Sequence, residues 1–124
     1  MVKIIRLSKS KIGQEEKNAV MEVLDKEYLG MGNEVGVFEK DLTTYFSRDT
    51  VCVSSGTAAI QLAIQGCNIG AGDEVLVPSM TYVATFQAIA ATGAKPIACD
   101  INEETCLIDL KDALSKISRD TKAI

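Results

Sequence analysis

The residues best suited to chemistry follow a short apolar run near the middle of the chain. Residues 51–53 (VCV) predict a buried strand, residues 54–57 (SSGT) a tight turn, and residues 58–63 the start of a helix. A helix that begins after such a turn presents free backbone N–H groups, and its dipole favours an anion there. Gly56 lets the backbone approach an anion closely because it has no Cβ. The turn is a candidate phosphate cradle, and the alternative is that its hydroxyls only cap the helix.

Two standard nucleotide-binding fingerprints are absent from this turn. It has neither the GxGxxG spacing of dinucleotide sites nor the GxxxxGK[ST] spacing of nucleoside triphosphate sites. The sequence therefore indicates an anion site without indicating either of these two classes.

Two further side chains are expected at the same edge of the sheet. Tyr82 follows the second predicted strand, with Thr81 and Thr85 nearby, and its ring can stack on a flat heterocycle. The alternative is a ring that packs where a helix begins. Asp100 ends the third predicted strand, where a turn or capping role is favoured over that of a site carboxylate.

These candidates depend on an alternation of strands and helices. Residues 51–53, 74–78 (EVLVP) and 96–101 (PIACDI) are each followed by a helical stretch, and residues 121–124 (TKAI) begin a fourth strand. Successive strand–helix units predict an α/β fold with three α/β/α layers around a mainly parallel sheet. Gly93 is predicted to end the second of these helices as its C′ residue. Because the fourth strand is only begun, we expect the chain to be the N-terminal part of a larger protein.

The first part of the chain follows a different pattern. Residues 14–27 predict an amphipathic helix with acidic residues in its first turn, and residues 28–36 hold three glycines and predict a loop. A second helix is indicated by apolar residues at helical spacing: Phe38, Leu42, Tyr45 and Phe46. We therefore expect residues 1–49 to be a helical segment with a glycine loop, followed in residues 50–124 by βα units that are truncated at the C-terminal end.

Composition excludes several classes of function. The 124 residues include 13 basic and 17 acidic side chains, a net charge of −4, no histidine and 47% hydrophobic residues. This balance is typical of a folded globular chain, and without a Lys/Arg cluster it argues against a nucleic-acid partner. The lack of histidine removes the commonest metal ligand and the usual general base, so no metal site is predicted.

The cysteines and the apolar runs indicate a cytoplasmic protein. Cys52, Cys67, Cys99 and Cys106 form no CxxC pair, and we expect all four to be reduced thiols. The N-terminal residues have no apolar core of signal-peptide length, and no apolar run is long enough to cross a membrane. A membrane partner is therefore not expected.

In their order, these segments resemble the DegT/DnrJ/StrS family of pyridoxal-phosphate-dependent sugar aminotransferases. The resemblance rests on IRLSKSKIGQEEKNAVMEVL, YLGMGNEVGVFEKDLTTYF, VSSGTAAIQLAI, GAGDEVLVPSMTYVATFQAIAATGAKPIACDI and the closing KAI. It implies a short apolar strand before the IG turn and, later in the chain, the large domain of a fold-type-I enzyme. Lys9 departs from the pattern, since many members have proline there.

The resemblance also implies a cofactor, substrates and an assembly. The cofactor would be pyridoxal 5′-phosphate, with its phosphate and ring held by five residues: Ser55, Gly56, Thr57, Ala58 and Tyr82. The substrates would be an amino donor, usually glutamate, and a nucleotide-linked sugar that meets the glycine loop around Leu29 and Gly30. The lysine that holds the cofactor covalently, and the carboxylate beside its ring nitrogen, are expected beyond residue 124. No catalytic residue is therefore assigned in this chain, and the full protein is expected to be a homodimer.

Two other functions remain open at this point. A relative on the same scaffold can use the cofactor for the dehydration of a sugar, with histidine in place of the lysine. The chain can also belong to an anion-binding or regulatory α/β module without catalysis.

Overall fold

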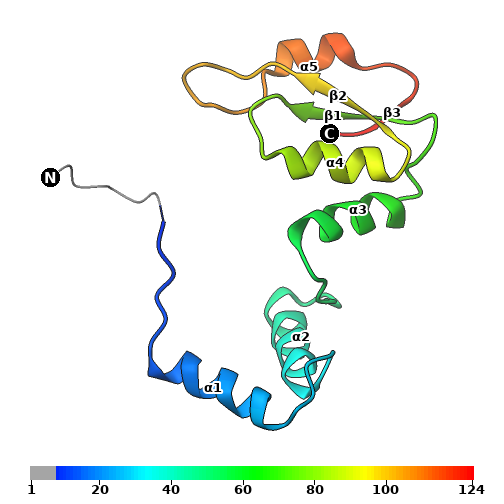
Figure 1. The fold of residues 1–124 in the computed structure, drawn as a ribbon. Helices are drawn as coiled ribbons and strands as arrows, with labels where there is room; N and C mark the ends of the chain where they lie inside the picture. The colour runs from blue at the N-terminus through cyan, green and yellow to red at the C-terminus, as the bar shows by residue number, and fades with distance from the viewer. Residues whose placement is uncertain (1–7) are drawn as a thin grey trace, which may run out of the picture. The chain divides into compact units, whose positions relative to one another are not determined.

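The computed structural model describes residues 8–124 and divides into two compact units, one ending at Cys52 and the other comprising Val53–Ile124 (Figure 1). The apolar strand that the resemblance implies before residue 8 lies outside the described residues.

The first unit consists of two helices joined by the glycine loop. These are α1, Gln14–Asp25, and α2, Asn33–Phe46. The prediction of a helix over residues 14–27 is confirmed to within two residues. The prediction of a loop through residue 36 is wrong, because α2 begins at Asn33 and includes Gly36. Glu34 lies in the first turn of α2, where its negative charge interacts favourably with the helix dipole and favours a helix that begins before Gly36. The glycine inside the helix lowers its stability by about 1 kcal/mol.

The segment at residues 51–53 is not a strand, so that prediction is also wrong. The N–H of Thr50 donates to Oγ1 of Thr43 at 3.1 Å, and the N–H of Cys52 donates to Oε1 of Glu39 at 2.7 Å. Both acceptors lie on α2. Because these alternate amides bind helix side chains and no strand pairs with the segment among the described residues, no ladder forms.

The second unit is built on a three-stranded parallel sheet. Its strands are β1, Glu74–Pro78, β2, Lys95–Cys99, and β3, Thr121–Ala123, in the order β2-β1-β3. The predicted strand over residues 74–78 and the beginning of a fourth predicted strand near the C-terminus are confirmed. The third predicted strand ends earlier than expected, because Ile101 instead bridges Ile108 in an antiparallel turn.

Helices cover both faces of this sheet. They are α4, Val83–Ala91, and α5, Leu110–Lys116, and a further helix, α3, Gly56–Gly66, packs against α4. On one face Val75 and Val77 pack with Ile89 of α4, and on the other Leu76 packs with Ala113 of α5. This alternation follows from the period of two in a strand, and Figure 1 shows α4 and α5 on opposite sides of the sheet. The prediction of an α/β fold with helices on both faces is confirmed.

Gly93 ends the α4 region as predicted. It follows the C-cap residue Thr92 and has φ of +87°, in the left-handed region. A Cβ at this position would also lie 3.3 Å from the backbone nitrogen of Ala71. Glycine therefore permits both the backbone conformation and the close approach of the two segments.

A polar cluster ties the start of β1 to its neighbours. Glu74 accepts a hydrogen bond from Oγ of Ser118 at 2.7 Å and another from Nζ of Lys95 at 3.3 Å. The Ser118 hydroxyl and then the Lys95 ammonium hold the pKa of the Glu74 carboxyl below its usual range. Glu74 therefore favours its charged form in the folded protein.

This pKa shift predicts a dependence of stability on pH. Because the pKa is lower in the folded state, the contribution of Glu74 is present above about pH 4.3, the unfolded value, and is lost as the pH falls through the folded value. We expect Glu74→Gln to flatten the acid side of a plot of unfolding free energy against pH. Denaturant titrations over a pH series measure this, with Glu104→Gln as the matched control at an exposed site. Equal plots for the two variants would contradict the prediction.

Candidate functional site

The first turn of α3 contains the predicted anion cradle. Ser55 is the N-cap, and its Oγ accepts a hydrogen bond from the N–H of Ala58 at 3.2 Å. The N–H of Ala59 donates to the carbonyl of Ser55 at 3.0 Å. Among residues 8–124, the N–H groups of Gly56 and Thr57 have no partner. The capping role is thus present, and two backbone donors remain available beside it.

The surroundings of this turn suit a phosphate. Gly56 is exposed, and a Cβ built on it would meet no described atom within 4 Å. Crowding within the chain therefore does not require glycine here, whereas close approach by a ligand would. The first turn contains no acidic side chain, so nothing on it opposes the favourable dipole of the helix.

Ser55 can take part in both roles at once. Its oxygen accepts from the N–H of Ala58, and its hydroxyl proton remains free to donate. Ala58 is one of the residues that the resemblance assigns to the phosphate, and its N–H is used by the cap. The free donors of the turn are therefore the two amides of Gly56 and Thr57 and the hydroxyls.

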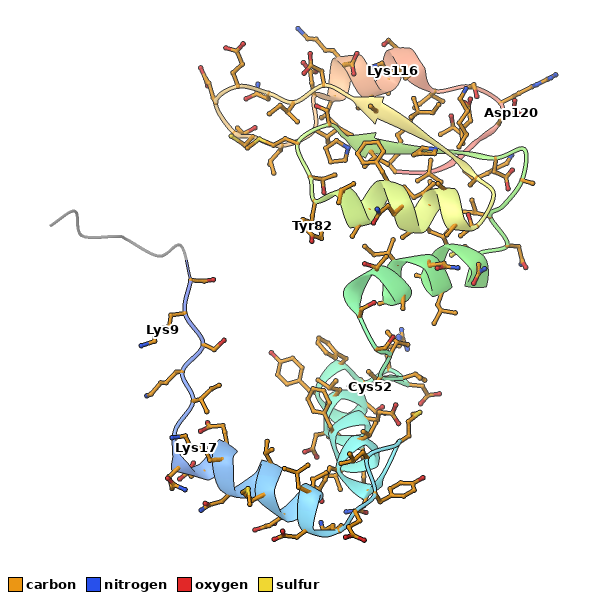
Figure 2. All side chains as sticks on the ribbon, in the orientation of Figure 1. Lys9, Lys17, Cys52, Tyr82, Lys116 and Asp120 are labelled. Atoms are coloured by element: carbon orange, nitrogen blue, oxygen red, sulfur yellow. The ribbon has the colours of Figure 1, made fainter. Side chains whose placement is uncertain are left out.

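Tyr82 lies at the N-cap of α4 with its side chain in the open. It makes no side-chain cap hydrogen bond, and 79% of its surface is exposed (Figure 2). Beside it, the hydroxyls of Thr81 and Thr85 lie 3.3 Å apart. Within the second unit the ring belongs to no apolar core, so its position leaves a face free for stacking.

The fold brings the turn and the tyrosine to one end of the second unit. Helices α3 and α4 pack together, and Figure 1 shows that both begin at the end where β1 and β2 finish. In open parallel sheets this is the end at which ligands bind. Ser55–Ala58 and Tyr82 therefore share the edge that the sequence predicted for them.

Asp100 has the turn role that the sequence favoured. Its Oδ1 accepts from the N–H of Ile101 at 2.8 Å, and its carbonyl accepts from the N–H of Asp109 at 2.8 Å. These contacts shape the turn after β2.

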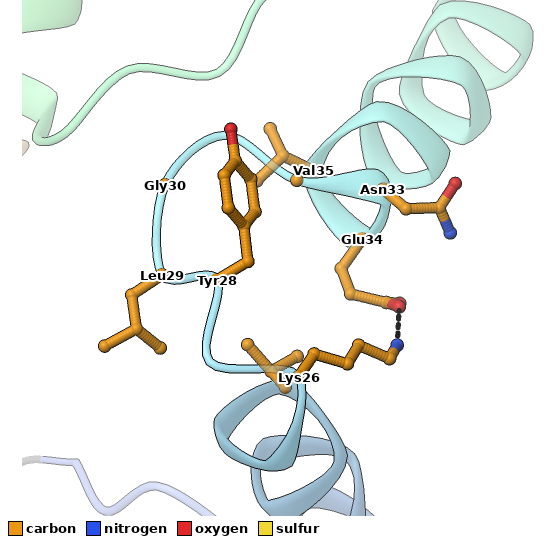
Figure 3. A pocket seen from close by; sticks show the side chains of 9 residues that line it. Lys26, Tyr28, Leu29, Gly30, Asn33, Glu34 and Val35 are labelled. Carbon is orange, nitrogen blue, oxygen red and sulfur yellow. Dashed lines mark hydrogen bonds and ion pairs between the residues drawn. The ribbon is translucent and has the colours of Figure 1, made fainter.

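A separate pocket lies in the glycine loop of the first unit. It has a volume of about 170 Å³ and is lined by Val23, Lys26, Tyr28, Leu29, Gly30, Gly32, Asn33, Glu34 and Val35 (Figure 3). Nζ of Lys26 and Oε1 of Glu34 form an ion pair at 3.1 Å. Leu29 and Gly30, the two residues predicted to contact substrate, both line this pocket.

The sequence reasoning missed the part that Tyr28 has in this loop. A Cβ on Gly32 would lie 3.2 Å from Cδ1 of Tyr28, and one on Gly30 would lie 3.6 Å from its Cζ. The two glycines thus leave room for the ring over the backbone. The pattern YLGMG, an aromatic residue followed by alternate glycines, is the signal that could have revealed this packing.

Some kinds of site are not found in the part of the chain that the structure describes. No group of three or more His, Cys, Asp or Glu side chains in residues 8–124 is placed to hold a metal ion. No helix in the same residues has the length and apolar character needed to span a membrane. All four cysteines are free thiols, with Cys99 buried.

The arrangement of the sheet and the helix N-terminus is typical of one class of protein, and similarity to known proteins identifies the family. A parallel sheet covered on both faces, with a free helix N-terminus at the strand ends, is typical of α/β proteins that bind phosphate-bearing ligands. The model of the DegT/DnrJ/EryC1/StrS aminotransferase family matches residues 10–124. The chain belongs to this family, which confirms the resemblance seen in the sequence.

Individual relatives agree with this assignment. The dTDP-4-dehydro-2,3,6-trideoxy-D-glucose 4-aminotransferase of Saccharopolyspora spinosa is 36% identical over 98% of this chain and 32% of its own. The solved structure of Spr1654 from Streptococcus pneumoniae, in its PMP-form, superposes with a TM-score of 0.85 at 34% identity over 95% of this chain and 30% of its own. A GDP-4-keto-6-deoxymannose-3-dehydratase gives 0.83 at 28% identity over 96% of this chain and 33% of its own. The chain thus spans about a third of the length of the relatives it matches.

The cap of α3 predicts a local contribution to stability. Ser55→Ala removes the acceptor for the N–H of Ala58 and should lower the free energy of unfolding by about 1 kcal/mol. Ser54→Ala is the matched control, because the hydroxyl of Ser54 makes no hydrogen bond among the described residues. Urea denaturation of both variants measures the difference. The cap has no such role if both substitutions cost the same.

Proposed function

We propose that the protein carrying this chain is a pyridoxal-phosphate-dependent aminotransferase that passes an amino group from a donor, glutamate, to a keto group of a nucleotide-linked sugar. The family match and the name of the Saccharopolyspora spinosa relative support the reaction class and the sugar acceptor. The PMP- and PLP-forms of Spr1654 support the cofactor.

The observation that carries this proposal is the free N-terminus of α3. Two amides without a partner in residues 8–124, adjacent hydroxyls and the positive end of an 11-residue helix form a donor set that suits a phosphate. Ser55, Gly56 and Thr57 are proposed to hold the cofactor phosphate, and Ala58 to fix the turn through the hydrogen bond of its N–H to Oγ of Ser55. In this proposal residues 50–124 supply the first βα units of the cofactor-binding domain.

Tyr82 is proposed to orient the other end of the cofactor. Its exposed ring begins α4 at the same end of the sheet as the phosphate turn, so it can lie against the pyridine ring. Pyridoxal phosphate, when bound, supplies the electron sink for the exchange of the amino group. Holding the phosphate and the ring together fixes the position of the reacting carbon.

The residue that attaches the cofactor is proposed to lie outside residues 1–124. The lysines at positions 26, 95 and 116 are engaged in ion pairs with Glu34, Glu74 and Asp112. A lysine that attacks a carbonyl must be neutral, whereas the hydrogen bond of Lys116 to Asp112 raises the pKa of Lys116. We assign no catalytic residue in this chain.

The glycine-loop pocket is proposed to contact the substrate. Leu29 is 72% exposed and lines it together with Gly30, so both are available to a ligand. The ion pair of Lys26 and Glu34 links the two helices that border this loop.

Dehydration of a nucleotide-linked sugar is the second candidate. The likeness to the GDP-4-keto-6-deoxymannose-3-dehydratase supports it, since that scaffold matches this chain nearly as well. The residue in the position of the cofactor-attaching lysine decides between the two, because a histidine there cannot hold the cofactor covalently.

We also propose a homodimer located in the cytoplasm. Many large apolar side chains of the described residues are exposed, among them Val20, Leu24, Phe38 and Leu114, and burial against further protein would remove them from water. The free thiols are consistent with a reducing compartment.

Substitutions at the two ends of the cofactor test the site in the full-length protein. Thr57→Ala should weaken retention of pyridoxal phosphate about tenfold or somewhat more, because one hydrogen bond to a charged phosphate is lost. Tyr82→Ala should lower activity more than binding, because the ring loses a stacking face of about 1 kcal/mol and can tilt. Tyr82→Phe keeps that face and is the control.

Melting of the cofactor-free and loaded forms separates this role from a structural one. A stacking tyrosine affects only the loaded form, whereas a packing tyrosine affects both. The site assignment is wrong if Tyr82→Ala lowers both melting temperatures equally and Thr57→Ala leaves cofactor affinity unchanged.

Covalent trapping tests where the cofactor is attached. We expect borohydride reduction of the loaded full-length protein, followed by peptide mapping, to find the pyridoxyl group on one lysine outside residues 1–124. The control is the same mapping without reduction. A single stoichiometric label on a lysine of this chain would overturn the assignment, and no label at all would favour the dehydratase.

A further inference from the structure

The outer edge of β2 has an unusual set of partners. Strand β2 lies at one edge of the sheet of the described residues. The N–H of Lys95 donates to the carbonyl of Asp73 at 2.8 Å, and the N–H of Ser79 donates to the carbonyl of Cys99 at 2.7 Å. Residues 95, 97 and 99 therefore face β1, and by the alternation of a parallel ladder residues 96, 98 and 100 face outward.

An edge of this kind normally offers unpaired N–H and C=O groups to another strand. Here some of these outward groups are missing or occupied, while the N–H of Ala98 and the carbonyl of Pro96 have no partner among the described residues. Pro96 has no N–H to donate. The carbonyl of Ala98 accepts from Nζ of Lys116 at 2.8 Å, and the N–H of Asp100 donates to Oδ2 of Asp112 at 2.6 Å. Side chains of α5 thus take the place that a further strand would occupy.

The two side chains of α5 also hold each other. Nζ of Lys116 and Oδ2 of Asp112 form an ion pair at 2.7 Å, one helical turn apart. The pKa of Asp112 is lowered mainly by its hydrogen bond with Lys116 and further by the hydrogen bond that it accepts from the N–H of Asp100. The same hydrogen bond with Asp112 raises the pKa of Lys116. Both groups are therefore charged near neutral pH, as their backbone contacts require.

The start of α5 fixes this pair against β2. The carboxylate of Asp109 caps the helix by accepting from the N–H of Lys111 at 2.7 Å. The backbone N–H of Asp109 donates to the carbonyl of Asp100 at 2.8 Å. Helix α5 is thus held to β2 and its following turn both at its start, through Asp109, and at its end, through Lys116. Figure 2 shows Lys116 on α5 beside the sheet.

We propose that Asp112, Lys116 and Pro96 form an edge clamp that makes β2 the terminal strand of its sheet and prevents an extended strand of a second copy from pairing with it. The clamp acts by occupying the carbonyl of Ala98 and the N–H of Asp100 and by removing the N–H at position 96. It is separate from the proposed cofactor contacts.

Hydrogen exchange in the full-length protein tests the clamp directly. Asp112→Ala removes the acceptor of the Asp100 N–H, and exchange at that amide should become about tenfold faster or more. Asp112→Asn keeps an oxygen acceptor there and should restore most of the protection. Unchanged exchange at Asp100 in the alanine variant would overturn the proposal.

Association measures the protective role. The double variant Asp112→Ala/Lys116→Met frees the two outward groups that α5 occupies, the carbonyl of Ala98 and the N–H of Asp100, so it should form larger species as concentration rises, seen by sedimentation and by thioflavin T fluorescence. Lys111→Met is the matched control, because it removes a charge from the same helix at an exposed site. The clamp is refuted if the double variant associates no more than this control.

A third variant distinguishes opening of the β2 edge from unfolding of α5 as the cause of association. Pro96→Val restores an outward N–H on β2 without altering the helix, and valine suits a strand. Added to the double variant, it should increase association further, whereas circular dichroism should show the same helix content as the double variant. A loss of helix without association would mean that Asp112 and Lys116 only stabilise α5, and would also refute the clamp.

Discussion

Strand β1 is paired along both edges and buried on both faces, and the second unit is organised around this strand. Its alternating side chains divide between two cores, with Val75 and Val77 on the side of α4 and Leu76 on the side of α5. Leu76 retains only 1% of its exposure. A strand buried in this way must satisfy its backbone through neighbouring strands, so β2 and β3 are as necessary to it as the apolar helices.

The position of the candidate site follows from the same constraint. A parallel strand must return to its starting end before the next begins, and the connecting helix starts where the strand stops. Tyr82 therefore lies at the carboxyl end of β1, at the head of α4. The packing of α3 beside α4 brings a second helix start to the same end, which gathers polar groups without any of them being buried.

The features that sequence patterns predicted correctly are those determined by interactions between residues close together in the sequence. The run at residues 74–78 is apolar and β-branched and became β1, and Gly93 was identifiable because a left-handed residue after a helix favours glycine. The turn at Ser55 was likewise recognisable, including its alternative role as a cap. In these places the residues that determine the structure are neighbours in the sequence.

Contacts between distant residues were not predictable in this way. Residues 51–53 have the composition of a strand, but Glu39 and Thr43 bind the amides of Cys52 and Thr50. Lys116 and Asp112 reach β2 from a helix that begins 11 residues after it ends, and no spacing rule links them to Ala98 and Asp100. For Leu29 and Gly30, the sequence indicated an available loop but not the Tyr28 ring that lies over it.

The hydroxyl of Ser55 has a further consequence for exchange of a bound anion. It accepts from the N–H of Ala58 with its oxygen and keeps its proton for another partner. An anion that accepts a hydrogen bond from this hydroxyl would leave the cap in place, so the helix start would need no rearrangement on binding or release. In the proposed site, binding of a phosphate would therefore carry no reorganisation cost at this helix start.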